Sequence, residues 1–132
     1  MTIPLLARDS HRPALRLLGA LDLPLTRLHE CTGPARHSFA MLLIGALRGP
    51  VLWIAPAWAR DHLNPDGISP LTGAENGPER LIFVAPERRE DLLWCMEEAL
   101  RSGAAPLIVA DLPEPPALTP VRRLHLAAAE GA

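Results

Sequence analysis

Apolar residues in this chain gather into short continuous runs that alternate with segments of helical spacing. Three runs have the length of a strand, at residues 51–55, 80–85 and 107–111. Continuous apolar runs of this kind are typical of parallel-sheet strands, which helices cover on both faces. A half-apolar run at residues 27–32, just before Gly33, predicts one further strand.

Helical periodicity fills the intervals between these strands. Residues 37–47 are apolar almost throughout, which predicts a helix buried on most sides. Residues 87–102 have acidic residues in the first turn and an arginine in the last. Residues 121–130 follow Thr119 at the N-cap position and a proline at N1. Strands that alternate with helices imply right-handed βαβ crossovers, so the predicted fold class is α/β, with a parallel sheet of about four strands flanked by helices.

The remaining segments carry weaker patterns. Residues 1–24 form an N-terminal arm, in which residues 14–21 are apolar at helical spacing and predict either a helix or a packing arm. Residues 58–63 predict a short helix at best. Residues 64–78 are rich in Gly, Pro, Asn and Ser and predict a loop. The chain therefore divides into the arm and one α/β domain, residues 25–132.

The composition fits one ordinary globular domain. The chain has 132 residues, of which 48% are hydrophobic and 21% charged, and its formal net charge is −2. This charge gives no general attraction to nucleic acid. All 13 basic residues are arginines, so any mechanism that needs a catalytic or phosphate-binding lysine is excluded.

The sequence also predicts a cytoplasmic location. No apolar run approaches the roughly 18 residues of a membrane span, and the first residues lack the basic and apolar regions of a signal peptide. The two cysteines and five histidines show no spacing typical of a metal site. We expect no membrane partner and no bound metal.

The stretch around Gly33 has the strand–turn–helix order of a phosphate-binding loop, but it lacks the side chains that such a loop uses. When Gly33 is aligned with the first glycine of G-x-x-x-x-G-K-[ST], Ser38 takes the second glycine position, Phe39 the lysine and Ala40 the hydroxyl residue. The lysine binds the β- and γ-phosphates, and the hydroxyl binds Mg²⁺. A phenyl ring and a methyl group do neither. The sequence predicts a degenerate loop.

Some features of this loop still favour an anion. Backbone N–H groups at a helix N-terminus attract phosphate, and Arg36 and His37 offer positive charge. Asp111, at the end of the last predicted strand, is placed to hold Mg²⁺ through water or to cap the next turn. A helix terminus contributes only about 0.3–1 kcal/mol when exposed, which hardly replaces a lysine. The candidate nucleotide-binding residues are Gly33, Pro34, Arg36, His37, Ser38 and Asp111.

Three arginines are candidates for binding a partner. Arg101, Arg122 and Arg123 could contact DNA phosphates or a protein surface, and three arginines on an acidic chain make DNA the weaker alternative. Glu97 and Glu98 are adjacent on a helix and point about 100° apart, so they do not converge on one substrate. We expect one of them to be solvated and the other to pair with Arg101.

In the order of its segments, the sequence resembles the RecA-like P-loop fold, and within it the ImuA group, the accessory proteins of damage-induced mutagenesis. Arg27–Pro34 resembles the loop strand, and Leu107–Asp111 a Walker-B-like strand. The segments similar to those of the ImuA group are Leu28–Gly33, Gly49–Ile54, Arg80–Val84, Asp91–Arg101 and Leu118–Leu126, in the same order.

The resemblance implies a non-catalytic adaptor in SOS-induced translesion DNA synthesis, with an error-prone polymerase or its accessory protein as the partner and no cofactor. Two alternatives remain open. One is a nucleotide-binding regulator that holds ATP–Mg²⁺ through Arg36 and main-chain amides. The other is an SOS cell-division inhibitor of the SulA type, from the same broad grouping. The chain is short for a RecA-type core, which continues into a strand beside the loop strand, and an open position there is expected to invite association.

Overall fold

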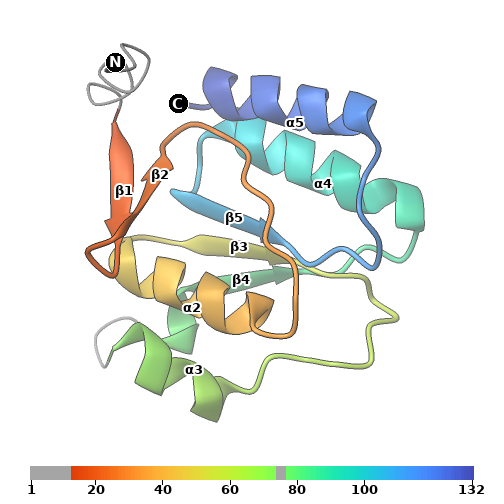
Figure 1. The fold of residues 1–132 in the computed structure, drawn as a ribbon. Helices are drawn as coiled ribbons and strands as arrows, with labels where there is room; N and C mark the ends of the chain where they lie inside the picture. Colours follow the sequence, from red (N-terminus) through yellow and green to blue (C-terminus); the bar gives the residue numbers. More distant parts are fainter. Residues whose placement is uncertain (1–12, 74–76) are drawn as a thin grey trace, which may run out of the picture.

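The computed structural model describes residues 13–73 and 77–132. These residues form three layers, in which a parallel sheet lies between two pairs of helices (Figure 1). In chain order the elements are β1 (Ala14–Leu17), β2 (Leu21–Pro24), α2 (Arg36–Ala46), β3 (Val51–Ile54), α3 (Pro65–Thr72), the 3₁₀ helix η1 (Pro78–Arg80), β4 (Leu81–Val84), α4 (Arg89–Ser102), β5 (Leu107–Ala110) and α5 (Leu118–Glu130).

The sheet consists of the three continuous apolar runs, as the sequence predicts. β3 lies in the centre and pairs in parallel with β4 on one side and β5 on the other. Val51 of β3 stands in register with Leu81 and with Leu107. The α/β class and the parallel sheet flanked by helices are thus confirmed, and within the described residues this sheet has three strands where about four were predicted.

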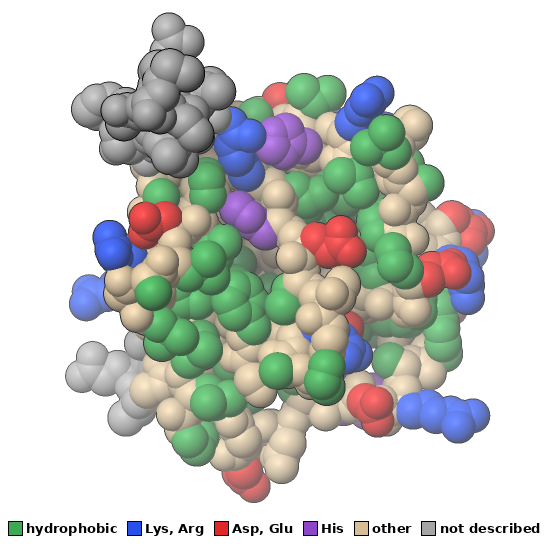
Figure 2. All heavy atoms as spheres, in the orientation of Figure 1, with side chains coloured by type: hydrophobic (Ala, Val, Ile, Leu, Met, Phe, Trp, Pro, Cys, Tyr) green, Lys and Arg blue, Asp and Glu red, His purple; other side chains and the backbone are tan. Residues whose placement is uncertain are grey.

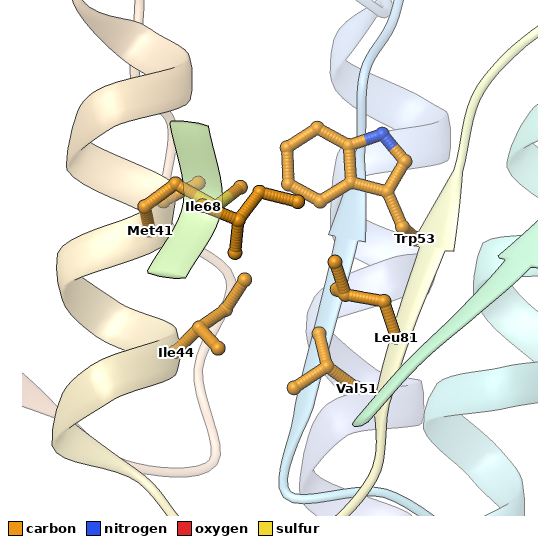
Figure 3. Packing of buried hydrophobic residues seen from close by; sticks show 7 residues of the cluster. Met41, Ile44, Val51, Trp53, Ile68 and Leu81 are labelled. Atoms are coloured by element: carbon orange, nitrogen blue, oxygen red, sulfur yellow. The ribbon is translucent and has the colours of Figure 1, made fainter. Parts of the chain in front are cut away.

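The face of the sheet toward α2 and α3 holds the larger buried cluster. Val51 and Trp53 project from β3 into it, and Figure 3 shows them facing Met41, Ile44 and Ile68 from the two helices. The complete buried cluster is Ala40, Met41, Ile44, Val51, Trp53, Ile68 and Leu81. Because successive residues of a strand point to opposite faces, the side chain of Ile54 points to the other face of the sheet.

Ile54 belongs to a second cluster on the opposite face of the sheet, under α4 and α5. Leu92 and Met96 of α4 and Leu124 of α5 are its other buried members. The three fall on helix positions that face the sheet, because residues three and four apart share one side of a helix. Leu92 and Met96 lie in the segment predicted as a helix at residues 87–102.

Residues 14–24 form a β hairpin, so the helix considered for residues 14–21 is wrong. β1 and β2 pair antiparallel. In the turn between them, Leu18 and Gly19 have φ values of 52° and 68°. Two successive residues with positive φ suit the tight turns that join antiparallel strands and interrupt a right-handed helix. Residues 1–12 of the predicted arm lie outside the described residues.

The strand predicted at residues 27–32 is also wrong, because this stretch carries no regular structure. Leu28 packs against the cluster under α4 and α5, whereas His29 and Glu30 are exposed. An inner strand of a parallel sheet must bury side chains on both faces. With only one apolar side chain to bury, the stretch passes beside the sheet without joining it.

Part of the predicted loop at residues 64–78 is the helix α3. Asn64 caps it, because its side-chain oxygen accepts a hydrogen bond from the Asp66 N–H at 3.1 Å. Ile68, only 2% exposed, anchors it in the core. This burial outweighs the low helix propensity of Pro70 inside the helix.

The other helices agree with the periodicity to within a few residues. α2, α4 and α5 occupy the segments predicted at 37–47, 87–102 and 121–130. α5 begins earlier than expected: Ala117 is its N-cap, so the predicted cap Thr119 lies inside the first turn. The short helix considered for residues 58–63 is absent.

Candidate functional site

The candidate site lies where the carboxyl ends of the parallel strands meet the N-terminus of α2. Asp111 directly follows β5, and Arg36 and His37 open α2. In open α/β sheets, ligands bind at the carboxyl ends of the strands. The structure therefore brings the predicted loop and the predicted Walker-B-like aspartate together, although 74 positions separate His37 from Asp111 in the sequence.

Both oxygens of the Asp111 carboxylate face a cationic or hydrogen-bonding side chain. His37 Nε2 donates to Asp111 Oδ2 at 2.7 Å, and Arg36 Nε lies 3.5 Å from Oδ1. The aspartate side chain is 21% exposed, so these contacts are partly shielded from water. The ring of His37 also meets the buried Trp53 edge to face, with centroids 5.8 Å apart. Asp111 and Trp53 thus fix the imidazole on two sides.

The turn before α2 brings the remaining loop residues to the surface. Gly33 has a φ of 107°, a backbone conformation that favours glycine. Its carbonyl oxygen accepts hydrogen bonds from the Arg36 N–H and from Arg36 Nη1, both at 3.3 Å. The N-cap residue Ala35 offers no side-chain acceptor to the first turn. Pro34 and Ser38 are exposed and make no polar side-chain contact among the described residues.

This arrangement changes what the helix N-terminus can do. The positive end of a helix dipole favours an anion, and here the Asp111 carboxylate already lies beside the first turn. A phosphate group at the same place would meet the repulsion of that carboxylate, and Arg36 would have to leave its present partner. A Mg²⁺ ion on Asp111 would likewise compete with Arg36 and His37.

A hollow of about 250 Å³ opens beside the His37–Asp111 pair. Its walls are partly aromatic, from Trp53 and Phe83, and partly polar, from two histidines and two aspartates. Its lining residues are His37, Trp53, Ala55, Asp61, His62, Leu63, Phe83 and Asp111. Figure 2 shows the face that carries α2, where hydrophobic side chains predominate and histidines and carboxylates lie among them.

Among the described residues, two of the three predicted partner-binding arginines form ion pairs and the third does not. Arg101 Nη2 donates to Glu97 at 2.9 Å, and Arg101 Nε to Glu130 at 2.9 Å. Arg123 Nη2 lies 3.0 Å from the other oxygen of Glu97. Arg101 and Arg123 therefore join α4 to α5 around one carboxylate. Arg122 is exposed and forms no ion pair within the described parts of the chain.

The Glu97 carboxylate is the buried member of the adjacent glutamate pair. The hydrogen bond from Arg101 holds the pKa of Glu97 below its ordinary range; desolvation opposes this shift, and Arg123 adds to it. Glu98 is about half exposed and lies 3.4 Å from Arg101. The expected pairing of one glutamate with Arg101 is confirmed for Glu97. Glu98 is the more solvated of the two, although it also lies within ion-pair distance of Arg101.

Periodicity did not single out the exposed residues of β4. Ile82 and Phe83 are 51% and 59% exposed although they sit in a continuous apolar run. A second hollow, of about 520 Å³, adjoins the same strand on the side of α4. Its lining residues are Val84, Ala85, Pro86, Arg88, Asp91, Trp94 and Cys95. A run of this type cannot reveal by itself that its strand will lie at a sheet edge.

Neither a metal site nor a membrane span is found within residues 13–73 and 77–132. No group of three or more His, Cys, Asp or Glu side chains is placed to hold a metal ion. No helix in these ranges combines the length and the apolar character needed to cross a bilayer. Comparisons with protein-family models, curated proteins and solved structures found no match to this chain.

Proposed function

We propose that this chain is a non-catalytic, RecA-like adaptor in SOS-induced translesion DNA synthesis, acting through contacts with an error-prone polymerase or its accessory protein. The observation that carries the proposal is the pairing of Asp111 with Arg36 and His37. Arg36 and His37 of the loop and its Walker-B-like carboxylate bond to one another, so none of them is held ready for a nucleotide.

The sequence adds two supports. The lysine position of the loop holds Phe39 and the hydroxyl position holds Ala40, so the groups that grip phosphate and Mg²⁺ are missing. The ordered segments that resemble the ImuA group include the strands β3 and β4 of the observed sheet, and β5 lies in the segment that resembles a Walker-B-like strand. Parallel strands joined through helices are compatible with a RecA-like core.

Calorimetric titration with ATP–Mg²⁺ tests the non-catalytic part of the proposal. We expect no binding in the micromolar range. Asp111→Asn should release Arg36 and His37 and give weak tripolyphosphate binding that the parent chain lacks, because the anion at the helix N-terminus is removed. Asp61→Asn is the matched control, because it removes a carboxylate from the 250 Å³ hollow and leaves Asp111 with Arg36 and His37. Micromolar ATP affinity in the parent chain would instead favour the nucleotide-binding regulator.

A cellular experiment tests the adaptor part. Deletion of the gene should abolish damage-induced mutation and leave cell division normal. The Arg36→Ala, His37→Ala double variant, checked by thermal unfolding for a folded domain, should restore mutation. Loss of mutation with this folded variant would argue for a nucleotide-dependent role. Filamentous cells on overexpression, with unchanged mutation on deletion, would point to the division-inhibitor alternative.

A further inference from the structure

The outer edge of β4 carries backbone groups that point away from the sheet. The Ala55 N–H donates to the Val84 carbonyl at 3.0 Å, and the Ala57 N–H donates to the Pro86 carbonyl at 3.0 Å. Since residues of a paired strand alternate between its two edges, residues 82, 84 and 86 face β3. The N–H and C=O groups of residues 81, 83 and 85 therefore face outward.

Most of these outward groups have no partner in the described structure. The Leu81 N–H bonds to the Pro78 carbonyl within η1. The Leu81 carbonyl and both backbone groups of Phe83 and Ala85 form no hydrogen bond with another described residue. They recur at alternate residues along one line, which is the hydrogen-bonding pattern that another strand would meet.

The side chains around this edge are apolar on both faces of the sheet. Phe83 lines the 250 Å³ hollow on the α2 side, and Ile82, one residue earlier, projects toward the α4 side. Trp94 of α4, 59% exposed, lines the 520 Å³ hollow next to Val84. By contrast, no β5 side chain is fully exposed, and Leu28 packs in the cluster that borders that strand. The apolar surface open to a partner thus lies at β4.

Each end of this edge carries an exposed carboxylate, whereas the guanidinium of Arg80, at the start of the edge, donates to three backbone carbonyls at the end of α2. Glu79 precedes β4 and Glu87 follows it, and both are exposed without an ion pair to another described residue. The neighbouring Arg88 already pairs with Asp91 at 2.8 Å. A second copy paired two-fold about Phe83 would bring the Glu79 end of each copy toward the Glu87 end of the other, and this approach of like charges opposes the pairing. A segment with basic residues at its ends meets no such repulsion.

We propose that the outer edge of β4 binds an extended segment of a partner protein, apolar at its centre and flanked by arginine or lysine, which pairs with β4 as a further strand. Main-chain hydrogen bonds to Phe83 and Ala85 hold the segment, and its alternate side chains enter the two hollows. This inference rests on the proposed adaptor function and gives it a surface and a kind of partner.

Selection from a library of random displayed dodecapeptides tests the proposal and does not require an identified partner. The parent chain should enrich β-forming peptides with basic ends. The affinity of synthetic copies of these peptides is measured by fluorescence anisotropy. When such a peptide is bound, hydrogen exchange at the Phe83 and Ala85 amides should slow. Phe83→Pro removes one outward donor but no hydrogen bond within the sheet, since proline is tolerated at an edge with its nitrogen turned outward. We expect it to weaken binding by about tenfold or more.

Phe83→Ala is the matched control, because it shortens the side chain and keeps the N–H group. It should lose clearly less affinity than Phe83→Pro, with both variants checked for the parent melting temperature. Equal losses, or enriched peptides that bind Phe83→Pro as tightly as the parent, would overturn the proposal. The Glu79→Lys, Glu87→Lys double variant should turn the preference toward peptides with acidic ends, and an unchanged preference would remove the charge argument.

The remaining outcomes separate this proposal from the one on which it rests. Sedimentation equilibrium of the parent chain should show a monomer, and a dimer that Phe83→Pro dissociates would assign the edge to a second copy. If selection enriches no peptide while deletion still abolishes damage-induced mutation, the edge proposal fails and the adaptor function stands. If ATP–Mg²⁺ binds at micromolar concentration, the adaptor function fails whatever the edge binds.

Discussion

At the scale of single residues, Glu97 shows how a carboxylate becomes part of the packing between two helices. The residue is 9% exposed, and its two oxygens face Arg101 and Arg123. Burial alone would favour the neutral acid, but the hydrogen bond from Arg101 reverses the balance and lowers the pKa of Glu97 below its ordinary value of 4.5. The charged form is therefore the one that joins α4 to α5.

This pairing predicts an acid-sensitive stability. The pKa of Glu97 is lower in the folded chain than in the unfolded one, so the unfolded chain binds more protons and stability falls as the pH drops. The contribution is complete above the ordinary pKa of 4.5 and is lost as the pH falls through the lower, folded value. Glu97→Gln should be less stable than the parent at neutral pH and should lose less stability in acid. Urea unfolding at several pH values measures both, with Glu98→Gln as the half-exposed control.

Two helical glycines should respond in opposite ways to alanine. A Cβ on Gly45 of α2 would lie 3.0 Å from the backbone oxygen of Thr72, at the contact with α3, whereas a Cβ on Gly67 would have nothing within 4 Å. Gly67→Ala should stabilise the chain, because alanine is about 1 kcal/mol better in a helix. Gly45→Ala gains the same propensity but forces α2 and α3 apart, at a cost of about 1–3 kcal/mol. Urea unfolding compares the two, and a stabilised Gly45→Ala would contradict the close packing.

At the scale of elements, the C-terminus of α2 depends on an arginine from a distant part of the chain. Arg80 donates from Nη1 to the Ile44 carbonyl at 2.9 Å, from Nη2 to the Leu47 carbonyl at 2.8 Å, and from Nε to the Gly49 carbonyl at 2.8 Å. The last carbonyls of a helix have no later turn to bond them. Here the Ile44 carbonyl also accepts from the Leu47 N–H at 3.3 Å, and Arg80 adds a side-chain donor to it and to the Leu47 and Gly49 carbonyls. One guanidinium thus ends α2 and ties it to the start of β4.

Removal of this side chain should therefore weaken the whole domain. A hydrogen bond to a charged group is worth about 1.5–3 kcal/mol at most. Because the three bonds come from one side chain, their energies do not add in full. Arg80→Ala should therefore lower the free energy of unfolding by about 2–3 kcal/mol. Arg80→Lys should recover only a small part of this lost stability, since an ammonium group cannot reach three carbonyls as the planar guanidinium does. Arg60→Ala, at an exposed arginine, should change stability by less than about 0.5 kcal/mol. A similar loss at both positions would contradict the capping role.

The elements also show what the sequence could and could not predict. Buried runs such as Val51–Ile54 are apolar because both faces are covered, so their pattern alone identified them. The hairpin was missed because Ala14–Leu17 is too short to establish a period, and the positive φ of Leu18 is a property of the turn. The helix α3 was missed because Pro70 lowers local propensity, while the burial of Ile68 is a tertiary effect.

The sequence predicted where the candidate site lies, but not how its side chains pair. Strand and helix order place Asp111 and the start of α2 at one edge of the sheet, and the structure brings Asp111 within 2.7 Å of His37. The sequence could not show that Arg36 and His37 would turn toward this carboxylate. The exposure of Phe83 was equally hidden, because it depends on the order β4-β3-β5 in the sheet. Nucleotide binding at these residues stays a prediction.

At the scale of the whole molecule, the hairpin beside the three-layered domain has one buried side chain. Leu17, at the end of β1, is 4% exposed, whereas the other hairpin side chains are exposed or half-buried. Figure 1 shows β1 descending toward the C-terminal end of α2. An isolated two-stranded hairpin is marginally stable in water, so its order should depend on this anchor.

The anchor predicts that the hairpin unfolds together with the domain. Leu17→Ala removes a nearly buried side chain and should lower the global free energy of unfolding by about 2–4 kcal/mol. Leu18→Ala is the matched truncation one residue later, at a side chain that is 77% exposed, and it should cost less than about 0.5 kcal/mol. Urea unfolding followed by tryptophan fluorescence reports the sheet, because Trp53 lies in the main core, and amide hydrogen exchange in β1 and β2 reports the hairpin. If Leu17→Ala speeds exchange in the hairpin but leaves the fluorescence transition unchanged, the hairpin opens independently of the sheet and is not part of its cooperative unit.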